Sequence, residues 1–255
     1  MPKLHGRFVW HELMTTDPAA ARDFYAVVAG WGTRDASMPE LPYTLFTLGE
    51  TPVGGLMELP EQARNQGARA GWVGYVAVDD VDAAVAEVQR LGGGVHVPPW
   101  DLPVGRMAVV ADPQRAVLVL FKGAEDWPDL PPGTPGRFGW NELLAVEWDK
   151  AFEFYATMFG WRKADAVDMG PLGTYQLFGL DGPPFGGMFN KPAAIPEPFW
   201  LYYITVGDID AAIDRVTAGG GQVLNGPVEV SGGWIAQAMD PQGALFALLG
   251  RREQG

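Results

Sequence analysis

Two glutamates occupy equivalent points of a repeated sequence and are the residues best suited to chemistry. Glu12 lies in Phe-Val-Trp-His-Glu-Leu, and Glu142 lies in Phe-Gly-Trp-Asn-Glu-Leu, 130 positions later. Both segments alternate as half-buried strands do, so each glutamate shares a strand face with Trp10 or Trp140. A carboxylate on an inward face is costly unless it is paired, hydrated or functional. We interpret Glu12 and Glu142 as candidate catalytic residues, either a general base or an anchor for a cationic ligand. A structural carboxylate that accepts from loop N–H groups is the alternative.

Aromatic side chains accompany these glutamates. Trp10 and Trp140 fall on the inward parity of their strands, and so do Tyr75, Tyr203 and Met57. Flat rings in such positions favour the binding of a planar or apolar molecule by stacking. We therefore predict that these five residues line a ligand site, with ordinary core packing as the alternative.

The chain has only three histidines, and one of them adjoins a candidate glutamate. His11 and Glu12 are neighbours on a strand, so their side chains point to opposite faces and cannot readily coordinate the same ion. Asn141 takes the place of His11 in the repeat, which would confine any role of the histidine to the first half. If a metal is bound, His11 and Glu12 are its candidate ligands. Packing beneath a helix is the alternative for His11.

Composition and charge exclude several classes of function. The 255 residues are 47% apolar and 19% charged, which is typical of a globular protein, and the net charge is −13. This acidity argues against nucleic acid or an anionic membrane as a partner. The absence of cysteine excludes disulfides, thiolate metal sites and a cysteine nucleophile. With no apolar run typical of a signal peptide or a membrane span, we expect a cytoplasmic protein; secretion without a signal peptide is the alternative.

The spacing of apolar residues predicts the same order of elements four times. After a strand at 7–15, Asp17 and Pro18 suit the start of a helix, and Gly30 can end it in the left-handed conformation. Further strands follow. The order strand, helix, strands then returns from residue 72, and the second half of the chain copies the first.

The domain boundaries follow from this repeat and from proline. Prolines concentrate at 126–136, which predicts a stiff linker between a first domain at 1–125 and a second at 137–255. The aspartates at the second helix of each half are expected to be helix caps and first-turn charges rather than a metal cluster. Residues 251–255 are expected to fray.

These motifs resemble a known superfamily. Four βαβββ units, with Val-Asp-Asp-Val-Asp-Ala-Ala at 78–84 and Asp-Pro-Gln before the last strand of each half, resemble the vicinal oxygen chelate proteins: glyoxalases, bleomycin-resistance proteins and extradiol dioxygenases. The tandem arrangement and the Trp-x-Glu-Leu opening are similar to a mycobacterial and actinobacterial subgroup. That subgroup includes a secreted culture-filtrate antigen and proteins described as hydroxylases or glyoxalase-like. The resemblance implies an α+β fold of two tandem domains, each a pair of βαβββ modules forming a curled mixed sheet around a cavity.

The resemblance also implies a metal site, held by His or Gln and Glu on three strands. Transferred to this sequence, the expected ligand positions fall on six residues that cannot bind a metal: Trp10, Val73, Val119, Trp140, Leu201 and Ala247. We therefore expect no cofactor, with a divalent metal as the alternative.

The leading interpretation is a protein that binds, or transforms without a metal, a small aromatic or carbonyl-bearing metabolite. One alternative is a metal-dependent lyase, isomerase or dioxygenase that uses non-standard ligands such as His11, Glu12 or Glu58. Another is a non-catalytic interaction protein with vestigial cavities. The expected partner is a small molecule, with no nucleic acid and no membrane, and the chain is expected to be a monomer or a homodimer.

Overall fold

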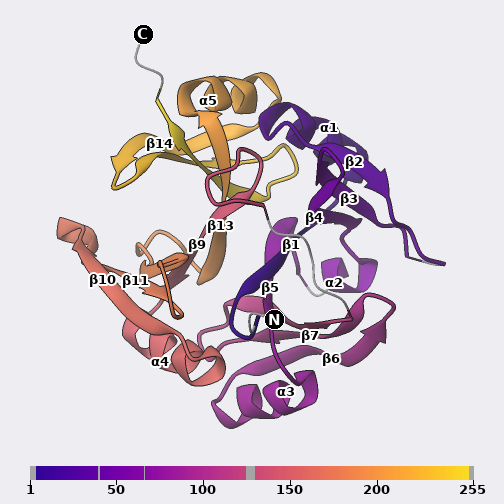
Figure 1. Ribbon diagram of the computed structural model, residues 1–255, viewed down its shortest axis with the longest axis vertical. Coiled ribbons are helices and arrows are strands. Elements are labelled where there is room, and N and C mark those ends of the chain that lie inside the picture. The colour runs from indigo at the N-terminus through magenta and orange to yellow at the C-terminus, as the bar shows by residue number, and fades with distance from the viewer. Residues whose placement is uncertain (1–3, 40, 66, 125–129, 253–255) are drawn as a thin grey trace. The chain divides into compact units, whose positions relative to one another are not determined.

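The computed structural model describes residues 4–39, 41–65, 67–124 and 130–252 (Figure 1). The first half of the chain contains two βαβββ modules in succession. The first module comprises β1 (Phe8–Thr15), α1 (Pro18–Val28), β2 (Gly32–Asp35), β3 (Thr44–Leu48) and β4 (Thr51–Glu58). After a short helix, α2 (Glu61–Asn65), the second module comprises β5 (Gly71–Ala77), α3 (Val81–Arg90), β6 (Gly94–Leu102), β7 (Gly105–Ala111) and β8 (Val117–Gly123).

The second half repeats this order. Its first module comprises β9 (Phe138–Ala145), α4 (Trp148–Phe159), β10 (Arg162–Asp168), the single turn η1 (Gly170–Leu172), β11 (Thr174–Gly179) and β12 (Gly186–Asn190). Its second module comprises β13 (Phe199–Asp208), α5 (Ile209–Ala218), β14 (Gln222–Val230), β15 (Gly233–Met239) and β16 (Leu245–Arg251). The predicted fourfold βαβββ order is confirmed.

Each half supplies the strands of one eight-stranded mixed sheet. The order in the first sheet is β2-β3-β4-β1-β5-β8-β7-β6, and in the second it is β10-β11-β12-β9-β13-β16-β15-β14. The two orders are identical once eight is added to each strand number. Within each module the first strand pairs in parallel with the last, and the other neighbouring strands pair antiparallel. The predicted α+β class is therefore confirmed.

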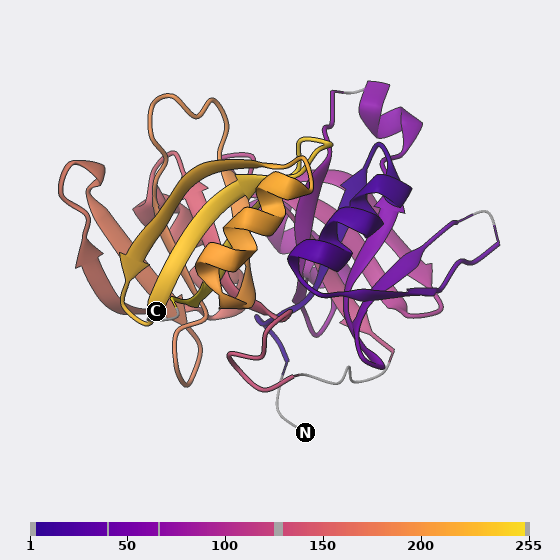
Figure 2. The same cartoon turned by 90° about the horizontal axis from the view of Figure 1, so that it is seen from above.

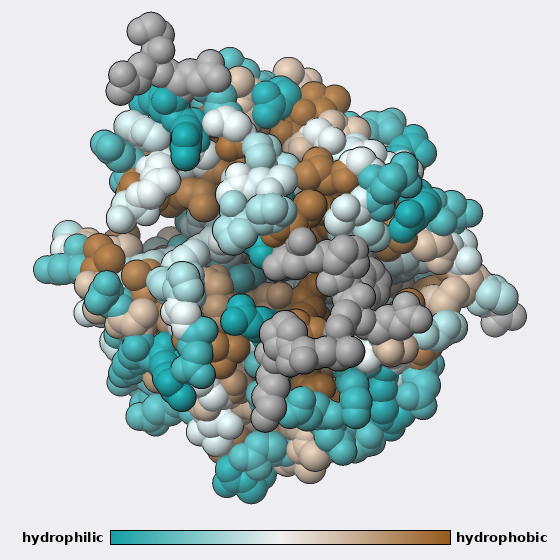
Figure 3. Space-filling view, viewed as in Figure 1, coloured by the Kyte–Doolittle hydropathy of each residue, from teal (hydrophilic) through white to brown (hydrophobic). Residues whose placement is uncertain are grey.

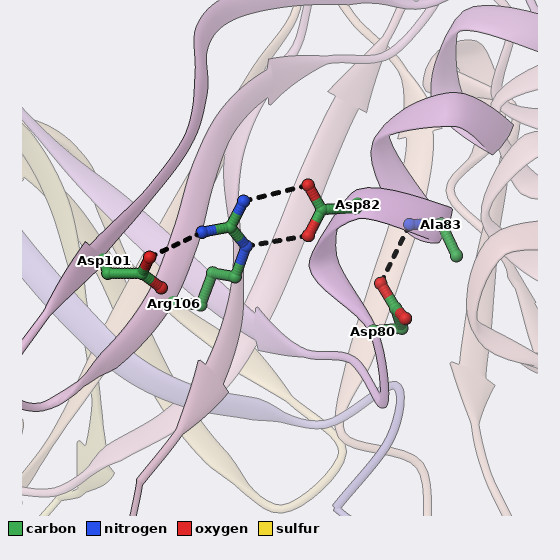
Figure 4. A network of polar contacts seen from close by, with 5 residues as sticks. All are labelled: Asp80, Asp82, Ala83, Asp101 and Arg106. Atoms are coloured by element: carbon green, nitrogen blue, oxygen red, sulfur yellow. Dashed lines mark hydrogen bonds and ion pairs between the residues drawn. The ribbon is translucent and has the colours of Figure 1, made fainter.

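Aspartate caps start three of the helices, as the sequence predicts. Asp17 Oδ1 accepts from the Ala20 N–H at 3.0 Å, and Gly30 follows α1 with φ of 72°. Asp80 caps α3 in the same way, through the Ala83 N–H at 3.0 Å (Figure 4). Asp82, in the first turn of α3, is bonded by both Nε and Nη2 of Arg106, which holds the pKa of Asp82 below its usual range (Figure 4). These carboxylates stabilise helix starts and form no metal cluster.

The described chain forms two compact units, and each unit draws on both halves of the sequence. The first unit contains the described residues of 1–9, 73–127 and 140–201. The second unit contains those of 10–72, 128–139 and 202–255. In the second unit α1 and α5 lie side by side, as both views show (Figures 1 and 2). In the first unit α3 contacts α4. The domain boundaries at 1–125 and 137–255 stay a prediction.

The end of the chain differs from the expectation of a frayed tail. β16 continues to Arg251, and Arg252 Nη2 donates to Asp210 at 2.8 Å while its guanidinium stacks on Trp234. The prediction was wrong for residues 251 and 252, because it ignored this ion pair with the first turn of α5. Residues 253–255, and residues 126–129 of the predicted linker, lie outside the described part of the chain.

The surface agrees with the acidic, globular composition. Hydrophilic side chains gather over α3 on the face shown in Figure 3. None of the helices that the structure describes is both long and apolar enough to cross a membrane.

Candidate functional site

Glu12 is buried and held by a hydrogen-bonded chain within the second unit. The Tyr43 hydroxyl donates to Glu12 Oε2 at 2.7 Å, and Trp10 Nε1 donates to the Tyr43 oxygen at 3.1 Å. The Glu12 side chain is on β1 and is only 5% exposed. Tyr43 immediately precedes β3, so two strands and their side chains converge on one carboxylate. The predicted sharing of a strand face by Trp10 and Glu12 agrees with their common partner.

The first unit contains the same chain of three side chains. Tyr175 donates to Glu142 Oε2 at 2.9 Å, and Trp140 Nε1 donates to the Tyr175 oxygen at 2.8 Å. Glu142 is also 5% exposed, and Trp140 is half-buried. We call these two sets the Trp–Tyr–Glu chains. Because both survive in a diverged repeat, the pair is a better candidate for function than any single buried carboxylate.

A glycine beside each glutamate makes room for the tyrosine. Gly55 on β4 is the register partner of Glu12 on β1, and Gly187 on β12 is the register partner of Glu142 on β9. A Cβ at Gly55 would overlap the Tyr43 hydroxyl and approach Trp10 Nε1 to 3.0 Å. A Cβ at Gly187 would likewise overlap the Tyr175 ring. Because Gly55 and Gly187 have no side chain, the ring of Tyr43 can pass over β4 to reach Glu12, and the ring of Tyr175 can pass over β12 to reach Glu142.

The tyrosines are the functional candidates that sequence reasoning missed. A signal was available, because Tyr43 precedes Gly55 by 12 positions and Tyr175 precedes Gly187 by the same 12. A pair of glycines also recurs inside a strand, at Gly54 and Gly55 and again at Gly186 and Gly187, and such a pair leaves space that an aromatic ring can fill.

Electrostatics keep the first tyrosine neutral. Burial raises the pKa of Tyr43 far above its usual range, and the negative charge of Glu12 and the hydrogen bond to it raise that pKa further. The hydrogen bond from Trp10 acts in the opposite direction but is the smallest effect. Tyr43 is therefore a permanent donor to Glu12 in the neutral pH range.

This raised pKa predicts a specific loss of stability in alkali. Since the folded protein favours the neutral phenol and the unfolded chain ionises near pH 10, stability should fall as the pH rises above about 10, by about 1.4 kcal/mol per pH unit from Tyr43. A Tyr43→Phe variant cannot ionise there, so its unfolding free energy should fall less steeply with pH. Urea unfolding of both proteins across this range measures the difference; equal slopes would contradict the assignment.

The other predicted lining residues lie in strands of the same modules. Met57 on β4 is half-buried and is the register partner of Met14. Tyr75 is buried in the first unit, where its ring meets the edge of Phe121 at 5.8 Å. Tyr203 is buried in the second unit, with Ala247 as its register partner. A role in ligand binding stays a prediction for these three residues.

His11 and Glu58 do not join Glu12. The His11 ring is buried and stacks on the Phe138 ring, with 4.0 Å between the ring centroids. It meets the Tyr202 ring edge to face, with 4.8 Å between the centroids. Glu58 is exposed, pairs with Arg64 at 3.6 Å, and lies opposite Thr15 in the register. These contacts place the three candidate non-standard ligands in different surroundings.

The donor set does not fit the metal site of the superfamily. Across residues 4–39, 41–65, 67–124 and 130–252, no three histidine, cysteine, aspartate or glutamate side chains are grouped to hold an ion. Trp10, at an expected ligand position, instead donates to Tyr43. The expected positions on later strands are buried apolar residues: Val73, Val119, Leu201 and Ala247.

Comparison with known proteins agrees with the repeat. The sequence model of the Glyoxalase/Bleomycin resistance protein/Dioxygenase superfamily matches residues 7–120 and again residues 137–248. The chain belongs to this superfamily. A Mycobacterium tuberculosis protein named as a glyoxylase, CFP32, is 33% identical over 94% of the chain and 93% of its own length. The anthracycline biosynthesis protein DauV of a Streptomyces species is 32% identical over 97% of the chain and 94% of its own length.

Solved structures share the fold at lower identity. A Mn(II)-bound glyoxalase from Novosphingobium aromaticivorans superposes with a TM-score of 0.63 at 19% identity, covering 97% of the chain and 82% of its own. The 2,3-dioxygenase LapB from a Pseudomonas species superposes with a TM-score of 0.67 at 12% identity, covering 99% of the chain and 95% of its own. Such likeness supports the tandem glyoxalase-like architecture and the predicted resemblance.

Proposed function

We propose that the chain binds a planar, carbonyl-bearing aromatic metabolite and that Glu12 and Glu142 act on it as general bases without a metal. The observation that supports this most is the pair of Trp–Tyr–Glu chains, one in each unit. A tyrosine fixes one oxygen of each carboxylate. Burial in a medium of low dielectric strengthens the action of the carboxylate on a bound molecule.

The chemistry is proton transfer next to a carbonyl group. The carboxylate of Glu12 or Glu142 takes a proton from the carbon beside the carbonyl, and the electron pair of that C–H bond becomes the double bond of an enolate. The carboxyl group then delivers a proton to the same carbon or to another carbon of the enolate system, which restores the carbonyl group. When the carboxyl proton has first exchanged with solvent, the product carries a solvent proton. Tyr43 and Tyr175 position the carboxylates during both steps, and no oxidant or reductant is consumed.

The ligand class rests on the tryptophans and on one relative. Trp10 and Trp140 lie beside the carboxylates, and an indole ring stacks well on an extended aromatic system. DauV, similar over almost the whole chain, is named for anthracycline biosynthesis, and anthracyclines are planar aromatic compounds that carry carbonyl groups. The proposed ligand therefore combines a flat ring system with a ketone that has a C–H bond on the saturated carbon beside it.

Quenching of tryptophan fluorescence tests this binding. Titration with an anthracycline should give saturable quenching. Trp10→Phe and Trp140→Phe should each weaken the affinity several-fold, because each replaces the indole by a smaller ring and removes the N–H that donates to its tyrosine. Trp148→Phe is the matched control, because Trp148 lies on α4 beside Lys163 and belongs to neither Trp–Tyr–Glu chain. Absence of saturable quenching, or equal weakening by Trp148→Phe, would sink the proposal. Addition of a chelator should leave the affinity unchanged.

A further inference from the structure

Each compact unit is joined by buried hydrogen bonds between the first and the second half of the chain. In the second unit Tyr25 of α1 donates to Asp240 Oδ2 at 3.3 Å, across 215 positions of sequence. Trp72 Nε1 donates to the Tyr25 oxygen at 2.9 Å. Asp240 Oδ1 accepts from the N–H groups of Gln242 and Ala244 at 2.9 and 2.8 Å, so the carboxylate is held in its own turn while it binds the other half.

The first unit repeats this arrangement with the halves exchanged. Tyr155 of α4, in the second half, donates to Asp112 Oδ2 in the first half at 2.9 Å. Trp200 Nε1 donates to the Tyr155 oxygen at 3.2 Å. The tyrosines and aspartates of both units are almost completely buried. The tyrosine of each half therefore donates to the aspartate of the other half.

A second pair of contacts is reciprocal in the same way. Trp31 Nε1 of the first half donates at 2.7 Å to the carbonyl of Gly136, the last residue before the second half. Trp161 Nε1 of the second half donates to the Gly6 carbonyl at 2.7 Å. Both indoles are buried and stack on the tyrosines named above: Trp31 on Tyr25 and Trp161 on Tyr155. The apolar core of each unit is thus built around these contacts.

We infer that the surface of each half that carries its tyrosine, its two tryptophans and its aspartate is a recognition surface for the other half of the same chain. A half alone would expose two indoles and leave an aspartate without its tyrosine, which is unfavourable for both apolar and polar groups. The association of the halves therefore does not require the covalent link. Each Trp–Tyr–Glu chain also lies in a unit that neither half builds by itself.

Cleavage of the full chain between the halves tests this inference. A protease site inserted between Gly133 and Thr134 lies before Gly136, so the second piece keeps the glycine whose carbonyl binds Trp31. After cleavage the two pieces should elute together at the mass of one intact chain, and remain together on hundredfold dilution. They should separate only in denaturant and reassociate when it is removed.

Variants of the cleaved protein test the named contacts. Tyr25→Phe and Tyr155→Phe should each weaken association of the pieces about tenfold or more, since each leaves a buried carboxylate and an indole N–H without the hydroxyl. Arg115→Ala is the control, because Arg115 also joins the halves through Glu197 but does so on the surface, where an ion pair contributes little. Separation or aggregation after cleavage, while the uncleaved insertion variant stays folded, would overturn the inference. If the uncleaved protein is a monomer, a complex of four pieces after cleavage would show that a second chain is the partner instead.

Discussion

The Glu12→Gln, Glu142→Gln double variant should lose proton exchange on a bound ketone by about 10²- to 10⁴-fold, the usual contribution of a positioned general base. Glutamine still accepts the hydrogen bonds that Tyr43 and Tyr175 donate to the glutamates, so the fold should be retained. Affinity for an anthracycline probe should change little, because the tryptophans supply the stacking surface. Incorporation of deuterium from solvent beside the carbonyl, followed by NMR, measures the rate directly.

The single variants separate the two sites. If one unit carries the activity, Glu12→Gln or Glu142→Gln alone should account for the whole loss; if both do, each should remove part of it. Tyr43→Phe and Tyr175→Phe keep the carboxylates but remove the bond that positions each of them and the acceptor of the tryptophan N–H. Exchange should therefore fall by less than in the double glutamine variant. Exchange and affinity that both survive the double variant would contradict the proposed role. A fall in affinity alone would identify the glutamates as anchors.

Much of the fold could be predicted because the sequence patterns that indicate it are local and occur in both halves of the chain. Asp17 and Asp80 cap their helices through N–H groups three positions away, so the sequence neighbourhood contains the whole interaction. Strand alternation likewise predicts that Trp10 and Glu12 share a face, and both contact Tyr43. Repetition at 130 positions separates such signals from chance.

The tyrosine partners could not be predicted in the same way, because their geometry depends on strand register. Glu12 meets Gly55 through a parallel pair, and no tight turn between those strands sets the register. The tyrosine can reach Glu12 only when Gly55 lies opposite that glutamate, because the Tyr43 hydroxyl then occupies the space that a side chain at position 55 would fill.

The contacts between the halves were also out of reach, for a different reason. Asp240 lies in Asp-Pro-Gln, and its bonds to the following N–H groups fully explain an aspartate at the first position of a turn. Nothing in that pattern requires a second partner. The other oxygen of Asp240 accepts from Tyr25, on a helix that begins more than two hundred positions earlier. The apolar face of that helix predicts that the face is buried, but it does not predict which part of the chain covers it.

The Trp–Tyr–Glu chain supplies hydrogen-bond donors at the place where the resemblance implies a metal ligand. Where the resemblance places a first ligand, Trp10 carries an N–H that can only donate, and it donates to the tyrosine that in turn donates to Glu12. A buried carboxylate needs such donors when no cation stands beside it. The chain of donors therefore explains how a glutamate persists on this strand in a fold that elsewhere uses metal.

Asp240→Ala should destabilise the protein by about 3–5 kcal/mol, the largest effect that we expect from a change outside the Trp–Tyr–Glu chains. The substitution leaves two backbone N–H groups, at Gln242 and Ala244, and the Tyr25 hydroxyl without their acceptor in a buried place. Asp240→Asn should cost much less, because an amide oxygen still accepts from the turn and its NH₂ can donate to the Tyr25 oxygen.

The matched surface control for this change is Asp210→Ala, which breaks only the ion pair with Arg252 and should cost about 0.2–1 kcal/mol. Unfolding in urea, compared through midpoints at constant slope, measures all three variants. Burial raises the pKa of Asp240, so the folded protein favours its protonated form, and stability from this group is lost as the pH rises through the raised pKa. Asp240→Asn cannot ionise and escapes that loss, so its deficit relative to the natural protein should shrink as the pH rises from about 4 to neutrality. A deficit for Asp240→Ala no larger than that of Asp210→Ala would mean that the buried carboxylate does not hold the two halves together.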